Sequence, residues 1–241
     1  MKSILINASY APSLIAFRGE LIAALIERGY VIHTSAPAYP ADVAQQLRTM
    51  GASVNQVALS RNGVNPMADV HYAFGLWRVI RQLRPDFVLG YTAKPNIWGS
   101  IVAGLMRIRS ASMVTGLGFS FSNSGGWIKM RVQALSQKLY AVATRFNDHV
   151  VFQNPDDLRD FLAAGCLRDA SKAFIVNGSG VDLKKYPVSP LAPGAVFLII
   201  ARFLGAKGIR AFAEAALALK ALRPQCRFLV VGFPDEGVDR I

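Results

Sequence analysis

This 241-residue sequence is poor in cysteine, in acidic residues and in long apolar runs. Its two cysteines, Cys166 and Cys226, lie far apart, which argues against a disulfide framework and against a zinc site. No uninterrupted apolar run approaches the roughly 18 residues of a membrane-spanning helix, so none is predicted. The apolar core of the first residues, MKSILINASYAPS, is too short for a signal peptide. We therefore expect the cytoplasm as the compartment.

Acidic residues number 15 against 27 lysines and arginines, which gives a net charge of +12. Such an excess favours anionic partners, namely nucleic acid, phosphorylated metabolites or an anionic membrane surface. Hydrophobic residues make up 52% of the chain, and the mean hydropathy is +0.30, so a large core can form and disorder is not expected. Positive charge together with apolar content predicts a protein that touches the inner membrane face without crossing it.

Several catalytic signatures are also missing. There is no GxxxxGK[ST] phosphate loop, and no Ser-His-Asp order with a nucleophile elbow. The three histidines are scattered and share no metal-ligand spacing, so no metal is expected. GLGFSF (116–121) has the first two glycines of a dinucleotide fingerprint, but Phe121 replaces the third. A tight glycine turn that lets some ligand approach the backbone is the favoured interpretation.

The sequence does contain a regular alternation of apolar strands and amphipathic helices. Strands are predicted at 3–8, 30–36, 52–60, 86–92, 110–116, 148–154 and 173–178. Helices are predicted at 14–29, 40–51, 67–83, 96–108, 126–146 and 156–165. This alternation predicts an α/β fold with a parallel sheet covered on both faces. Such sheets bind ligands beyond the carboxyl ends of their strands.

A proline-rich segment, KKYPVSPLAPGA (184–195), predicts a linker between two domains. We expect an N-terminal Rossmann-like domain at 1–185. Residues 186–241 are then the linker and the start of a second domain. That second part holds a strand (195–200), a helix (207–222) and a strand (227–232). Two strands and one helix cannot bury a parallel sheet alone, so we expect this domain to be incomplete.

Three segments carry candidate chemistry. In ARFLGAKG (201–208), Arg202 and Lys207 flank a turn from a strand into a helix, where two cations and the helix amides suit a diphosphate. Lys94 stands at a strand end beside a predicted helix N-terminus, which favours an anion, although a solvated surface lysine is the alternative. The basic, amphipathic helix at 126–146 suits a membrane surface and equally a core-facing helix with a solvated basic side.

At the domain junction the chain resembles the retaining glycosyltransferases of family 4. The resemblance is carried by NGSGVDLKKY and by AVFLIIARFLGAKGIRAFAEAALALKALRPQCRFLVVG, with Gly180, Val181 and Asp182 before the linker. Upstream, AFRGELIAALIERGY, YTAKPNIWGS and TGLGF are similar to bacterial members that build lipid-linked oligosaccharides, of the PglA type. The resemblance covers essentially the whole chain and implies the GT-B fold, in which two Rossmann-like domains face a cleft.

The resemblance implies roles for particular residues. Arg202 and Lys207 match the cations that bind the diphosphate of a nucleotide-sugar donor, which is a co-substrate, and no cofactor is expected. The acceptor would be a polyprenyl-diphosphate-linked saccharide at the inner face of the cell membrane, with no nucleic acid involved. The resemblance assigns the acceptor side of the cleft to Arg18, Lys94, Asn96, Gly116 and Gly118. Ala93 stands where many relatives have a histidine, so the role of that histidine is not transferred.

Family members continue with an E-x7-E segment that holds the donor ribose and sugar, whereas Glu236 comes too early to match it. We therefore expect a truncated chain, or one completed by a second chain. Three hypotheses stay open at this point. The chain is a glycosyltransferase or its acceptor half, a non-catalytic chain that binds a lipid-linked sugar or a partner subunit, or a nucleotide-sugar enzyme of the same fold such as a 2-epimerase.

Overall fold

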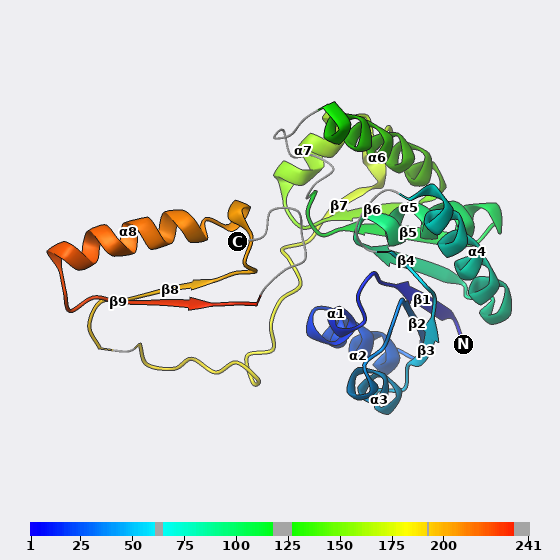
Figure 1. Ribbon diagram of the computed structural model, residues 1–241. Coiled ribbons are helices and arrows are strands. Elements are labelled where there is room, and N and C mark those ends of the chain that lie inside the picture. The colour runs from blue at the N-terminus through cyan, green and yellow to red at the C-terminus, as the bar shows by residue number, and fades with distance from the viewer. Residues whose placement is uncertain (61–64, 118–126, 192, 234–241) are drawn as a thin grey trace. The chain divides into compact units, whose positions relative to one another are not determined.

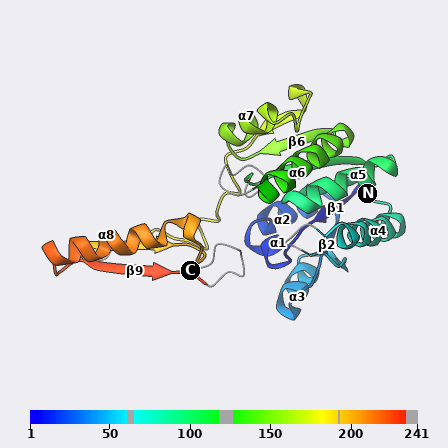
Figure 2. The ribbon, with the colours of Figure 1, turned by 45° about the horizontal axis from the view of Figure 1, so that its top comes forward.

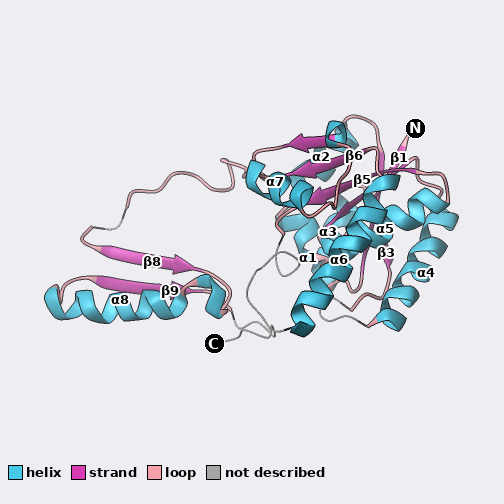
Figure 3. Cartoon of the chain, turned by 90° about the horizontal axis from the view of Figure 1, so that it is seen from above, coloured by secondary structure: helices cyan, strands magenta, loops and turns pink. Residues whose placement is uncertain are grey.

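The computed structural model contains one seven-stranded sheet, formed by seven of the apolar runs predicted as strands (Figures 1 and 3). All neighbouring strands in this sheet are parallel. The strand order is β3-β2-β1-β4-β5-β6-β7. The strands are β1 (Ser3–Asn7), β2 (Val31–Ala36), β3 (Ser53–Gln56), β4 (Phe87–Tyr91), β5 (Arg109–Val114), β6 (His149–Phe152) and β7 (Ala173–Ile175). The predicted α/β class with a parallel sheet is confirmed.

The structure describes residues 1–60, 65–117, 127–191 and 193–233. It divides the chain into two units, Met1–Asp182 and Leu183–Ile241. The described residues of the predicted linker, 184–195, form neither helix nor strand. The seven-stranded sheet belongs entirely to the first unit, and the boundary expected after residue 185 lies close to the observed division.

Helices cover both faces of the large sheet. Successive residues of a strand point to opposite faces, and β1 shows this directly. Ile6 packs in an apolar cluster with α1, α2 and α3, whereas its neighbour Leu5 packs in a cluster with α4 and α5. A third cluster joins α5, α6 and α7 to β5 and β6. The helices α4, α5 and α6 lie side by side, with α5 in contact with both others (Figure 2).

The helices of the first unit follow the predicted pattern with one informative difference. They are α1 (Pro12–Ala16), α2 (Gly19–Glu27), α3 (Ala41–Thr49), α4 (Pro66–Leu83), α5 (Ala93–Leu105), α6 (Trp127–Phe146) and α7 (Pro155–Ala163). A single helix was predicted at 14–29, but the structure breaks it after Ala16. Phe17 and Arg18 leave the helical conformation, with φ of −120° and −126°. None of the helices in the described part of the chain combines the length and the hydropathy needed to cross a membrane.

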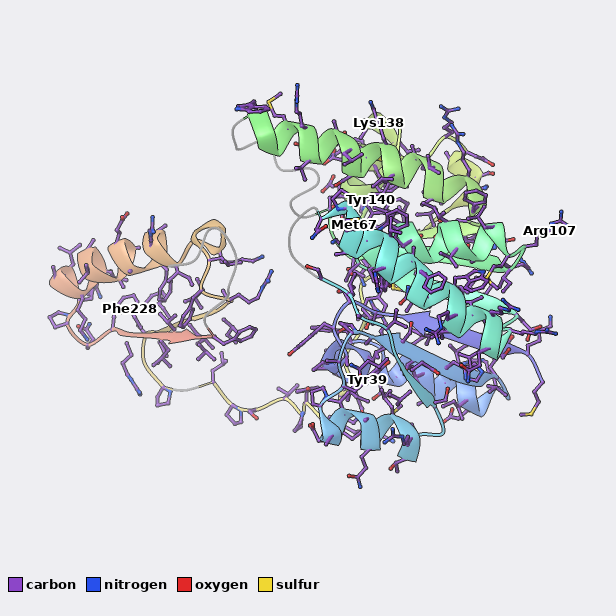
Figure 4. All side chains as sticks on the ribbon, turned by 45° about the vertical axis from the view of Figure 1, so that its right-hand side comes forward. Tyr39, Met67, Arg107, Lys138, Tyr140 and Phe228 are labelled. Atoms are coloured by element: carbon purple, nitrogen blue, oxygen red, sulfur yellow. The ribbon has the colours of Figure 1, made fainter. Side chains whose placement is uncertain are left out.

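The second unit contains a two-stranded parallel sheet and one long helix. Its elements are β8 (Val196–Ile200), a 3-10 turn (Gly205–Lys207), α8 (Ile209–Leu222) and β9 (Arg227–Val231). Phe228 of β9 stacks on Phe197 of β8, and Phe212 of α8 packs edge-on against it (Figure 4). Many apolar side chains stay exposed, such as Ile200 at 72% and Leu217 at 75%. This sheet therefore has little apolar cover of its own within the described residues.

We expect limited proteolysis to cut first within residues 184–195. The described part of this segment has no regular hydrogen-bonded structure, and Val188 is 99% exposed. Mass spectrometry of the early products should identify a resistant fragment close to residues 1–182. The second unit should be degraded next, because its sheet edges are open. Early cleavage inside the large sheet, with the linker intact, would contradict this expectation.

Candidate functional site

The most distinctive part of the first unit is the carboxyl edge of its sheet between β1 and β4. The chain winds from β1 toward β3 on one side and continues from β4 toward β7 on the other, so the connections diverge at this point. The loops that follow β1 and β4 meet there, and the Thr92 hydroxyl donates to the Ser9 hydroxyl at 2.9 Å. Ligands of open α/β sheets bind at such a switch point.

Thr92 is held in an unusual backbone conformation directly after β4. Its φ is 70° and its ψ is 161°, a region that residues other than glycine rarely adopt. Holding a side-chain-bearing residue there costs on the order of 1–3 kcal/mol, and such strain tends to occur at functional sites. Thr92 immediately precedes α5, so this geometry sets where that helix begins.

Arg18 lies at the same edge and is only 4% exposed. The break between α1 and α2 places it there, and its guanidinium carbon lies 5.0 Å from the centre of the Tyr91 ring. Its Nη1 donates to the Phe17 carbonyl at 2.9 Å and to the Ser179 hydroxyl at 2.7 Å. Ser179 comes from the segment after β7, so this arginine joins three distant parts of the first unit.

Within the part of the chain that the structure describes, the charge of Arg18 is not balanced by a carboxylate. Among the described residues, none of the ion pairs includes Arg18, and its buried Nε lacks a hydrogen-bond partner. Burial lowers the pKa of this guanidinium from its ordinary value, and the nearby Tyr91 partly offsets that effect. Burial also raises the pKa of Tyr91 to about 12, so Tyr91 stays neutral near pH 7. A buried cation with a donor to spare is suited to a phosphate or carboxylate group.

Lys94 lies in the first turn of α5, at the strand end where it was predicted. Its Nζ lies 2.6 Å from Oδ1 of Asp69 on α4, and both side chains are largely buried. This ion pair was not anticipated from the sequence, because the partners lie 25 positions apart and Asp69 carries no motif. The pair balances the charge of Lys94 and anchors α4 to the start of α5.

Asn96 belongs to the core rather than to the accessible edge. It is fully buried, and its amide donates to the Met113 carbonyl at 3.0 Å, which ties α5 to β5. Gly90 on β4 lets the start of α5 approach that strand closely, since a Cβ there would lie 2.8 Å from the Pro95 carbonyl oxygen. Asn96 therefore supports the site by fixing α5 against the sheet.

Of the two predicted edge glycines, only Gly116 can be placed. It follows β5 at the same sheet edge, is exposed, and has a φ of +132°, which favours glycine. Gly118 lies outside the described residues. The turn expected from GLGFSF thus begins at the edge where a ligand is expected. The prediction that these glycines line a cleft stays a prediction.

In the second unit, Arg202 and Lys207 flank the turn from β8 into α8, and both are exposed. Gly208 begins the helix with a φ of 75°, a left-handed conformation that needs glycine. The sequence-based placement of both cations at a strand-to-helix turn is therefore matched by the structure. A helix N-terminus attracts anions through its free amides and its dipole.

Sequence reasoning missed Tyr91, Ser179 and Asp69. Ser179 lies in NGSG (177–180) and directly follows the last predicted strand of the first domain, and Tyr91 lies in a predicted strand. No local pattern could reveal that both approach Arg18. In the described part of the chain no cluster of three or more His, Cys, Asp or Glu side chains could hold a metal ion. The expectation that the chain uses no metal stays a prediction.

The model of the glycosyl transferase 4-like domain family matches residues 16–178. Over 240 residues, the chain is 28% identical to the N,N'-diacetylbacillosaminyl-diphospho-undecaprenol alpha-1,3-N-acetylgalactosaminyltransferase of Campylobacter jejuni. That alignment covers 93% of this chain and 62% of the Campylobacter protein. The chain thus spans less than two thirds of this relative.

Solved structures bear out the fold. HepE from Anabaena, in complex with UDP and glucose, superposes with a TM-score of 0.70 at 19% identity, over 98% of this chain and 62% of HepE. A UDP-GlcNAc 2-epimerase from Neisseria meningitidis, bound to UDP-GlcNAc, gives 0.59 at 13% identity, over 95% of this chain and 64% of the epimerase. These likenesses confirm the predicted GT-B type of fold. Because an epimerase shares this fold, the fold alone does not distinguish a glycosyltransferase from a 2-epimerase.

We expect Asp69→Asn to destabilise the first unit by roughly 3 kcal/mol, because it leaves the largely buried ammonium of Lys94 without its partner. Thermal or urea unfolding would measure this loss. The double variant Asp69→Leu with Lys94→Met should recover most of the stability, since it removes both charges together. Asp156→Asn is the matched control, because Asp156 forms an exposed pair with Arg159. Equal losses for Asp69→Asn and Asp156→Asn would contradict a buried, stabilising pair.

Proposed function

We propose a function on the premise that this chain belongs to the family of glycosyl transferase 4-like domains. In this proposal, the chain takes part in transferring a sugar from a nucleotide-sugar donor to a saccharide carried on polyprenyl diphosphate. The first unit holds the acceptor, and the second unit contributes to donor binding. The named activity of the Campylobacter relative, which acts on an undecaprenol-linked sugar, supports this acceptor class.

The observation that carries the proposal is the buried, unbalanced charge of Arg18. A diphosphate-linked acceptor presents an anion, and Arg18 has a buried Nε–H that lacks a partner. Its position at the β1–β4 switch point is where sheets of this kind bind ligands. In a water-poor environment a charge-assisted hydrogen bond is stronger than at the surface. Arg18 would therefore hold a phosphate of the acceptor and fix its orientation.

Arg202 and Lys207 are proposed to bind the donor diphosphate. Negative charge builds on the leaving diphosphate as the bond to the sugar breaks. Cations that are already in place stabilise that charge more in the transition state than in the ground state. No residue is assigned here as nucleophile or base. Binding of a lipid-linked sugar without transfer is the second candidate, and turnover of a nucleotide-sugar by the 241-residue chain separates the two.

A polyprenyl chain resides in a bilayer, so the proposed function includes peripheral attachment at the inner face of the cell membrane. The net charge of +12 supports attachment to an anionic surface.

We expect Arg18→Met to abolish the stabilisation of the first unit by inorganic pyrophosphate while leaving the fold intact, whereas any binding of pyrophosphate at Arg202 and Lys207 in the second unit should persist. Pyrophosphate stands in for the acceptor diphosphate. At about 100 times its Kd a ligand stabilises the folded state by about 2.7 kcal/mol, which raises the Tm of the wild type. The Tm of ligand-free Arg18→Met should not fall below that of the wild type, because removing the guanidinium also removes its burial cost. Differential scanning calorimetry with and without pyrophosphate measures both effects.

Arg28→Met is the matched control for this experiment, since Arg28 is an exposed arginine that follows α2. It should keep the full response to pyrophosphate. Arg18→Lys should give a weakened response, because lysine retains the charge but lacks the planar fork. A response that is unchanged in Arg18→Met, or lost equally in Arg28→Met, would remove the support that Arg18 gives to the proposal.

We expect Lys207→Ala and Arg202→Ala each to weaken binding of UDP by about tenfold or more, since hydrogen bonds to charged groups contribute on the order of 1.5–3 kcal/mol. Two such contacts allow only roughly millimolar affinity once the cost of association is included. Titration followed by NMR suits that range. Arg210→Ala is the control, because Arg210 is exposed in the first turn of α8. Unchanged binding in both variants would argue against the assigned donor role.

A further inference from the structure

The outward face of α4 is apolar at its start and cationic at its end. Its exposed positions recur every three or four residues, as one face of a helix requires, while Tyr72, Leu76 and Ile80 face the core. Met67, Val70 and Phe74 are 81%, 62% and 57% exposed. They are followed on the same face by two arginines, Arg78 and Arg81, which are also exposed.

The outward face of α6 repeats this composition. Figure 4 shows Lys138 projecting from α6 on the side away from Tyr140, which is buried against the layer beneath. The exposed apolar residues of α6 are Trp127, Met130, Leu135, Val142 and Phe146. Its exposed cations are Arg131, Lys138 and Arg145.

Both helices also pair an arginine with a tryptophan. The guanidinium of Arg81 lies 5.1 Å from the Trp77 ring on α4, and that of Arg131 lies 5.1 Å from the Trp127 ring on α6. Trp77, Arg78, Arg81 and Gln82 line an open hollow of about 370 Å³. An aromatic ring beside a cation suits the boundary between lipid tails and phosphate headgroups.

Acidic side chains are almost absent from this layer. The sequences of α4, α5 and α6 contain a single acidic residue, Asp69, and it is buried and paired with Lys94. Other helical acids of the first unit lie in α2 and α3 on the opposite side of the sheet, and in α7, which packs beside α6. On α4 and α6 themselves, exposed cations and exposed apolar residues therefore occur together without an exposed acid. A polar face that served only solubility would not need exposed tryptophan, phenylalanine and methionine beside its arginines.

We propose that the outward faces of α4 and α6, together called the α4–α6 face, dock onto a bilayer that contains anionic phospholipid. The apolar residues enter the interface, and the arginines and Lys138 bind headgroup phosphates. Charge complementarity selects this occupant, since a face without exposed acids attracts an anionic surface. The sequence pointed only to 126–146, whereas the structure adds the exposed apolar side chains at the start of α4. The inference rests on the proposed function only insofar as its acceptor is carried by a membrane lipid.

Co-sedimentation with vesicles tests the α4–α6 face, using phosphatidylcholine alone or mixed with phosphatidylglycerol. Neither vesicle contains polyprenyl acceptor. The full chain should bind the mixed vesicles at least about tenfold more tightly than the neutral ones, and raising the salt from about 50 mM to about 500 mM should weaken that binding. Arg78→Glu with Arg81→Glu should reduce binding about tenfold or more. Phe74→Ser should reduce it at either salt concentration, because its contribution is apolar.

The matched control is Arg28→Glu with Arg48→Glu, which changes the net charge equally on exposed positions of the opposite side of the sheet. It should retain most of the binding. Equal loss in both double variants would show a response to net charge alone and overturn the proposal, as would a wild type that binds neither vesicle. A dimer in solution that Phe74→Ser dissociates would assign this face to a second copy instead. If vesicle binding fails while pyrophosphate still stabilises the wild type through Arg18, the docking surface falls and the proposed function stands.

Discussion

The reversal of strand order at β1 is the constraint on which the rest of the first unit depends. Neighbouring β1 and β4 send the chain to opposite sides, and the loops that follow them meet at the carboxyl edge, where Thr92 donates to Ser9. Asn7, the last residue of β1, is fully buried beneath this edge. Its Oδ1 accepts from the hydroxyls of Ser35 and Tyr72, which belong to β2 and α4. A buried polar residue with these partners holds the neighbouring strand β2 and the helix α4 to one strand end, so the geometry at this edge is fixed before any ligand arrives.

The sheet and the helices could be predicted because their signal is local. Runs of Val, Ile and Leu between amphipathic segments mark a parallel sheet, and the turn around Arg202 and Lys207 lies within eight residues of sequence. The break between α1 and α2 could not be predicted, since the apolar spacing of 14–29 continues through it. At the break, Arg18 contacts Tyr91 and Ser179, which lie far away in the sequence. Local periodicity favours one helix, and tertiary contacts override it.

The candidate site could be predicted only in part for the same reason, because it depends on contacts between residues that are distant in the sequence. A lysine at a helix start suggests an anion site, but only the fold reveals that Asp69 already balances Lys94. The family resemblance assigns Arg18 to the acceptor side, but only the fold reveals that Arg18 is buried and forms no ion pair with the residues that the structure describes. Sequence gives the type of charge and its approximate place. Whether a charge is balanced depends on residues brought together by the sheet, and this decides which cation can recruit a ligand.

Arginines therefore have two physically different roles in the first unit. Arg18 is buried, so salt screens its field weakly, and its hydrogen bonds select a group that can accept them in a fixed direction. Arg78, Arg81 and Arg131 are exposed, so their attraction to anions is long-ranged, weak for each residue and reduced by salt. Directional binding suits recognition of one acceptor group, whereas diffuse attraction suits a bilayer, whose phosphates are many and mobile. Burial alone distinguishes the two roles that we propose for arginine, and it makes them separable by ionic strength in the same protein.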